Sequence, residues 1–241
     1  MLPRRLQAEL LDGLTANDPV AARSRRDLRR VHRFMRTRPR LVRMLRELAP
    51  APGMTLRVLE LGAGDGSLLL DVARTLAPVW PPVDLTLLDR LSLIDDATVA
   101  EYARCGWTAR PCVMDVLDWA RATVEASADT TARWDLVIAN LFLHHFDSLE
   151  LTRVLGAIAA STDQLVVCEP RRGWPALAGS HLIGGLGANA VTRTDAVLSV
   201  HAGFRERELT ALWPVAAGWR LQEQASGVFS HCFRATRTRT Q

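Results

Sequence analysis

Short apolar runs alternate with amphipathic stretches through the middle of the chain. The runs predict strands at residues 56–61, 85–89, 111–115, 135–140 and 164–169, and a 3.6-residue period predicts helices at 67–76, 94–105 and 149–160. The first, fourth and fifth runs are almost wholly apolar, as expected of strands that helices cover on both faces. This alternation predicts an α/β fold with a parallel sheet.

The two ends of the chain follow other patterns. Residues 1–50 read as helices at 4–14, from near Asn17-Asp18-Pro19 onward, and at 41–48, and residues 50–53 end this region. After helical stretches around 195–201 and 206–213, residues 218–225 and 228–236 predict two strands joined by a Ser226-Gly227 turn. We therefore expect one main domain at 54–241 preceded by a helical cap at 1–53.

Charge and composition remove several classes of function. All 30 basic residues are arginine, which excludes P-loop and Schiff-base chemistry because both need lysine. Residues 1–50 hold 13 arginines against five acidic residues, so this segment could bind nucleic acid, although a cap whose arginines face solvent or pair with acids is favoured. The four cysteines lack CxxC spacing and are expected to be free thiols.

The chain shows no sign of a membrane segment. No stretch of about 18 residues is uncharged and apolar, and the first 14 residues carry Arg4, Arg5, Glu9 and Asp12. We expect a cytoplasmic protein.

A glycine-rich turn follows the first expected strand. Gly62, Gly64 and Gly66 permit a sharp turn into a helix and a close approach of the backbone, together with Ala63, to a ligand. Glu60 precedes them and could accept hydrogen bonds from an ammonium group. Because the spacing is GxGxG after an acid, where the nicotinamide fingerprint is GxGxxG, it favours S-adenosylmethionine over a dinucleotide.

Polar residues end the next three expected strands. Asp89 could accept hydrogen bonds from two ribose hydroxyls, and Asn140 could contact the amino-acid end of the cofactor. Asp115 could accept from the adenine amino group, while the Val116 N–H donates to a ring nitrogen. Their neighbours Arg90 and Leu141 complete the candidate cofactor contacts. Ligands of open α/β sheets sit at this edge, so four suitable strand ends support one another.

At this point the sequence resembles the class I S-adenosylmethionine-dependent methyltransferases over roughly residues 55–236. Residues 60–66, Asp89, Asp115 and the segment 140–146 carry the likeness. It implies a Rossmann-like sheet with a terminal antiparallel hairpin, S-adenosylmethionine as the cofactor, and a substrate lid around 171–213. Residues 27–32 are similar to the helical cap that closes over the cofactor in related small-molecule enzymes.

A narrower resemblance concerns residues 168–172, 184–193 and 229–231. They look like segments of methyltransferases encoded beside type III polyketide synthases. This likeness implies a small phenolic or polyketide-derived acceptor.

Candidate acceptor residues are less specific. His145 or His144, after the fourth strand, could accept a phenol proton, or both could simply fix the loop through hydrogen bonds. Arg171 and Arg172 could hold a carboxylate or phenolate of the substrate, or be solvated. Further pocket candidates are polar residues of the lid, hairpin and cap: His181, Arg193, Asp195, His231, His32 and Arg36.

Two absences narrow the reaction. Only Asn140 and Glu169 offer oxygen ligands at the ends of the fourth and fifth strands, which predicts metal independence. Asn140 is followed by Leu141-Phe142-Leu143 instead of Pro-Pro-aromatic, which argues against a nucleobase target. We expect O-methylation, or alternatively C-methylation, of a small acceptor. An RNA methyltransferase, a non-catalytic cofactor-binding partner and a nicotinamide oxidoreductase remain open, as does a homodimer.

Overall fold

A seven-stranded sheet forms the centre of the molecule. The computed structural model describes residues 2–48, 53–126, 133–214 and 218–238. Within these residues the strand order is β3-β2-β1-β4-β5-β7-β6, with β7 antiparallel to both of its neighbours and β1 to β5 parallel. The strands are β1 Leu56–Leu61, β2 Val83–Asp89, β3 Trp107–Val113, β4 Leu136–Asn140, β5 Gln164–Pro170, β6 Trp219–Ser226 and β7 Ser230–Arg237.

Helices cover both faces of this sheet. One buried cluster joins the strands to α2 (Thr37–Arg46), α3 (Ser67–Leu76) and Tyr102 of α4 (Asp96–Arg104). The other joins them to α5 (Val116–Glu125) and α6 (Ser148–Ser161), the latter opened by an Asp147/Glu150 capping box. The predicted α/β fold with a terminal hairpin is confirmed, and the apolar strand runs are explained by burial on two faces.

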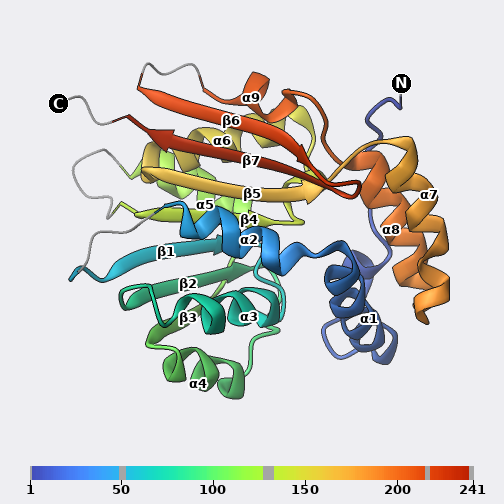
Figure 1. The fold of residues 1–241 in the computed structure, drawn as a ribbon, viewed down its shortest axis with the longest axis horizontal. Helices are drawn as coiled ribbons and strands as arrows, with labels where there is room; N and C mark the ends of the chain where they lie inside the picture. Colours follow the sequence, from blue (N-terminus) through green and yellow to red (C-terminus); the bar gives the residue numbers. More distant parts are fainter. Residues whose placement is uncertain (1, 49–52, 127–132, 215–217, 239–241) are drawn as a thin grey trace.

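The remaining helices gather at the edge toward which β1 and β5 point. They are α1 (Pro19–Met35), α7 (Trp174–Leu182) and α8 (Ala190–Ala202), while short α9 (Glu208–Leu212) lies near β6 (Figure 1). Asp27 of α1 accepts a hydrogen bond from the Asn189 N–H at 2.9 Å, just before α8. The predicted α1 start is confirmed, because Asp18 caps the helix and Pro19 takes its first position.

Several predicted elements are wrong or displaced. Residues 4–14 do not form the predicted helix and are irregular except for a 3-10 turn at Leu11–Gly13. The N–H groups of Arg5, Leu10 and Leu11 bond to α8, through the His201 carbonyl and the Asp195 carboxylate. α2 begins at Thr37, so Pro39 falls in its first turn, where no N–H partner is needed. β3 ends at Val113, and α5 and α7 were not predicted. The break expected at 50–53 lies almost wholly outside the described residues.

α2 packs in the same buried cluster as the sheet, through Leu41, Val42 and Leu45. The part of the expected cap that stands over the strand ends is therefore α1 with the segment before it. None of the described helices is long and apolar enough to cross a membrane. All four cysteines are free, and the Sγ atoms of Cys168 and Cys232 lie 3.9 Å apart.

Candidate active site

The glycine loop joins β1 to α3 through three residues with positive φ. Gly62, Gly64 and Gly66 have φ of 70°, 57° and 70°. At Gly62 a Cβ atom would come within 2.2 Å of the Phe142 ring, so a larger residue cannot fit. The N–H groups of all three are bonded inside the protein, that of Gly62 to the Leu88 carbonyl and that of Gly64 to Asp89 at 2.8 Å. The glycines thus act by shaping the backbone.

Two buried oxygens at the ends of adjacent strands have no hydrogen-bond partner among the residues that the structure describes. They are Oε2 of Glu60, on β1, and Oδ1 of Asn140, on β4. The strands pair with Leu61 opposite Ala139. Burial, reinforced by the charges of Asp89 and Asp65, raises the pKa of Glu60 well above its usual value. Unpaired buried acceptors are uncommon, and an ammonium group would supply their missing donors.

The other candidate cofactor residues lie at or just after the ends of β2, β3 and β4. Asp89 accepts hydrogen bonds from the Gly64 and Leu91 N–H groups. Asp115 is not a strand end as expected but the N-cap of α5, exposed, with Oδ1 accepting from the Leu117 N–H. Val116 is buried as the first residue of that helix, and Leu141 takes a left-handed φ of 51° directly after β4.

Glu169 organises the loop after β4. Its Oε1 accepts hydrogen bonds from the N–H groups of Phe142 and Leu143, and its Oε2 lies 2.7 Å from Nδ1 of His144. Nε2 of His144 lies 3.3 Å from Glu9. Burial lowers the pKa of His144, but the hydrogen bonds to the two carboxylates outweigh it and raise the pKa to about 9. A histidine held protonated between two carboxylates is suited to fixing the loop.

His145 is differently placed. Its Nδ1 lies 3.2 Å from Asp12, and a quarter of its side chain is exposed. Asp12 also pairs with Arg90 at 3.0 Å, so this candidate cofactor residue is tied to the N-terminal segment. Of the two histidines, His145 alone leaves a ring nitrogen outside the described hydrogen bonds.

Sequence reasoning missed the N-terminal segment, which covers the histidine loop. Arg4 donates to the carbonyls of Ala202, His144 and Phe146, and Glu9 contacts both His144 and Ser199. The acids Glu9 and Asp12 were visible in the sequence. The histidines that they contact lie more than 130 residues away along the chain, and no local pattern reveals such contacts.

Glu9, His144 and His145 each offer a possible metal-ligand atom, and these three atoms lie within 4.8 Å of one another. Glu9 is hydrogen-bonded to His144 and Ser199, and His144 also to Glu169, so we interpret the group as a hydrogen-bond network rather than a metal site. Metal independence stays a prediction.

The expected substrate residues do not form one group. His32 lies near Asp65 of the glycine loop, and burial lowers its pKa to about 4. Arg36 is exposed at the α1–α2 junction, and His181 is exposed in the last turn of α7. Arg172 is buried, with donors used by Leu2, Gly203 and Glu208, which leaves it a structural role.

α1 lies against the glycine loop through an ion pair. Arg29 contacts Asp65 at 2.9 Å, and Asp65 also accepts from the Ser67 N–H at the start of α3. This contact brings the predicted cap to the candidate cofactor residues.

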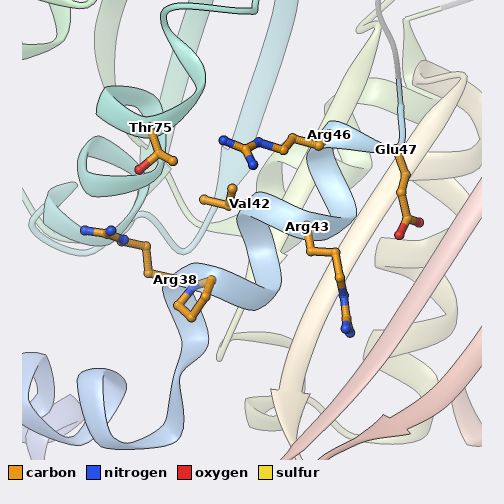
Figure 2. Close-up of a pocket in the computed structure, with 7 residues that line it drawn as sticks. Arg38, Val42, Arg43, Arg46, Glu47 and Thr75 are labelled. Atoms are coloured by element: carbon orange, nitrogen blue, oxygen red, sulfur yellow. The ribbon is translucent and has the colours of Figure 1, made fainter.

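A separate cavity of about 430 Å³ lies along α2, on a basic surface. It is lined by Arg38, Val42, Arg43, Arg46 and Thr75, whose side chains are drawn in Figure 2. Thr75 belongs to the last turn of α3, at the opposite end of that helix from the glycine loop. None of the candidate site residues lines this cavity.

Comparisons with known proteins place the fold. Neither the protein-family models nor the curated proteins contain a match to this chain. Among solved structures, the plantazolicin methyltransferase BpumL with bound S-adenosylhomocysteine is similar, at 13% identity, 92% of this chain, 91% of that chain and a TM-score of 0.59.

Its complex with a triazolic desmethyl-plantazolicin analogue gives a TM-score of 0.60 at 12% identity, over 92% of each chain. A candidate O-methyltransferase from Nostoc punctiforme is similar at 17% identity with a TM-score of 0.53, over 82% of this chain and 56% of that chain. The chain has the Rossmann-like fold of the class I methyltransferases.

Proposed function

We propose that this chain is an S-adenosylmethionine-dependent methyltransferase that acts on a small-molecule acceptor. The observation that carries the proposal is the pair of orphaned buried oxygens, on Glu60 and Asn140, at the ends of adjacent strands next to the glycine loop. The methyltransferase fold supports it, and so do the S-adenosylhomocysteine complexes of BpumL.

The chain offers contacts for each part of the cofactor. Glu60 and Asn140 would bind the ammonium group, Asp89 the ribose hydroxyls, and Asp115 with the Val116 N–H the adenine edge. When bound, S-adenosylmethionine supplies an electrophilic methyl group on a sulfonium sulfur. The protein then has to align the acceptor and exclude water.

We further propose O-methylation of a phenolic or polyketide-derived acceptor, with His145 as the proton acceptor. Nδ1 of His145 faces Asp12 at 3.2 Å, and a carboxylate there stabilises the imidazolium that forms when Nε2 takes a proton. His144, fixed by Glu9 and Glu169, would hold the loop. The local likeness of residues 168–172, 184–193 and 229–231 to methyltransferases encoded beside type III polyketide synthases supports this acceptor class. C-methylation of a similar acceptor is the alternative.

The experiment is transfer of labelled methyl from S-adenosylmethionine to a panel of phenols, with RNA and total protein as competing acceptors. Label should appear in one or more phenols. His145→Gln should lower turnover about a hundredfold or more, whereas exposed Arg153→Gln should leave it unchanged. Label that reaches RNA or protein but no phenol would contradict the proposal. A homodimer and a cytoplasmic location stay predictions.

A further inference from the structure

A cavity of about 210 Å³ lies at the carboxyl end of β5, beyond the histidine loop. Arg171 and Arg172 line it from the end of β5, Arg205 and Glu206 from the loop before α9, and His231 from β7. We call it the β5 cavity. The start of α7, at Gly173 and Pro175, also lines it.

The lining of the β5 cavity is basic. Arg171, Arg172 and Arg205 line it with one carboxylate, that of Glu206, and Arg172 is already paired with Glu208. Arg171 gives one Nη1 hydrogen bond, to the Gly227 carbonyl at 3.0 Å. The Arg205 Nε is buried without a hydrogen bond, and its carboxylate neighbours, Glu206 and Glu208, lie 4.0 and 3.9 Å away. Donor capacity on Arg171 and Arg205 thus exceeds the acceptors that the described residues supply.

His231 adds a second unsatisfied group. Its side chain is 1% exposed, and its Nε2 lies 2.8 Å from the Glu223 carboxylate. That carboxylate also accepts from the N–H groups of Leu209 and Thr210, so both of its oxygens are engaged. The His231 Nδ1 is buried without a partner. Two of the buried polar atoms that lack a partner among the described residues, Arg205 Nε and His231 Nδ1, thus belong to residues that line this one cavity, where a ligand would complete their hydrogen bonds.

We propose that the β5 cavity binds an oxyanion, a carboxylate or a phosphate, through Arg171 and Arg205, with a proton taken up from solvent on His231 Nδ1 so that this ring nitrogen donates to the anion. Guanidinium groups bind such anions through paired, charge-assisted hydrogen bonds. The α7 N-terminus adds unpaired N–H groups and a partial positive charge. At about 210 Å³ the cavity has room for one oxyanion with part of a ring.

The β5 cavity is adjacent to the candidate acceptor site. Glu169, which holds His144, precedes Arg171 by two residues, or about 7 Å along a strand. This part of the inference rests on the proposed function: the methyl acceptor carries an anionic group that lies in the cavity while its reacting atom lies near His145. A separate small anion is the other source of the same chemistry.

The test measures binding of benzoate, and of uncharged benzamide, to the whole chain by NMR titration in the absence of cofactor. Benzoate should bind and benzamide should not. Arg205→Gln and Arg171→Gln should each weaken benzoate binding about tenfold or more. Arg220→Gln, an exposed charge-matched control on β6, should have no effect. Two separate variants are used so that misfolding of either one, checked by circular dichroism, leaves the other as the test.

The proposal is overturned if benzoate and benzamide bind alike, or if a folded Arg171→Gln variant binds benzoate as the wild type does. Two further experiments identify the source of the anion, and a positive result in either one supports anion binding in the β5 cavity. Phosphate that competes with benzoate indicates a free anion. Loss of methyl transfer to a carboxylated phenol in Arg171→Gln, with transfer to its methyl ester retained, indicates the acceptor itself. Because benzoate binding needs no turnover, a chain without methyl transfer activity would leave this test intact.

Discussion

His144 should make the stability of the protein depend on pH in the alkaline range. Its pKa is raised from 6.5 to about 9 by the carboxylates of Glu169 and Glu9, which outweigh the effect of burial. One pKa unit corresponds to about 1.4 kcal/mol, so the protonated histidine contributes about 3 kcal/mol to the free energy of unfolding.

The direction follows from proton binding. Below pH 6.5 both the folded and the unfolded chain carry the proton, and the contribution is complete. Between about 6.5 and 9 the unfolded chain loses the proton while the folded chain keeps it, so the contribution falls as the pH rises and is lost above about 9.

The assay is urea unfolding of the wild type and of His144→Gln at pH 6, 8 and 9.5. Glutamine stays neutral and can still donate a hydrogen bond to a carboxylate. The difference in unfolding free energy between the two proteins should shrink by about 3 kcal/mol from pH 6 to 9.5, whereas other alkaline groups, such as buried Tyr102, act on both proteins alike. A difference that stays constant over this range would refute the assignment of His144 as a protonated link between Glu9 and Glu169.

Further predictions concern the backbone near the site. Gly62→Ala should lower the free energy of unfolding in urea by more than Gly106→Ala does. The φ angle is similar at the two positions, but only at Gly62 does the new Cβ meet a side chain, that of Phe142 at 2.2 Å. Equal losses of unfolding free energy would contradict this explanation. Asp18→Ala should cost about 1 kcal/mol because Asp18 caps α1 through the Val20 N–H at 2.7 Å. Asp18→Asn should retain most of that energy, and a loss equal to that of alanine would rule out capping as the cause.

The central strands could be predicted from the sequence because burial on both faces leaves nearly continuous apolar runs. β3 was misplaced because it is an edge strand. Its first half alternates buried and exposed residues, it contains Pro111, and its exposed last residue, Val113, is followed by exposed Met114, which extends the apolar pattern. Asp115 was therefore interpreted as a strand end when it caps α5.

The strand-end residues of the candidate site could be predicted from the sequence, but the partners of its histidines could not. Glu60, Asp89 and Asn140 lie at the carboxyl ends of recognisable strands, so their position at one edge of the sheet could be inferred. The partners of the histidines could not, since Glu9 and Asp12 contact them from an irregular segment whose spacing resembles a helix. Long-range polar contacts leave no periodicity in the sequence.

The most direct test of the central claim is calorimetric titration with S-adenosylhomocysteine, and with NADH in parallel. Our account predicts that S-adenosylhomocysteine binds and NADH does not. Glu60→Gln should weaken the binding about tenfold or more, because it removes the carboxylate expected to bind the ammonium group, while Glu125→Gln, exposed at the end of α5, should have no effect. Absence of S-adenosylhomocysteine binding, or equal affinity in a folded Glu60→Gln variant, would contradict it.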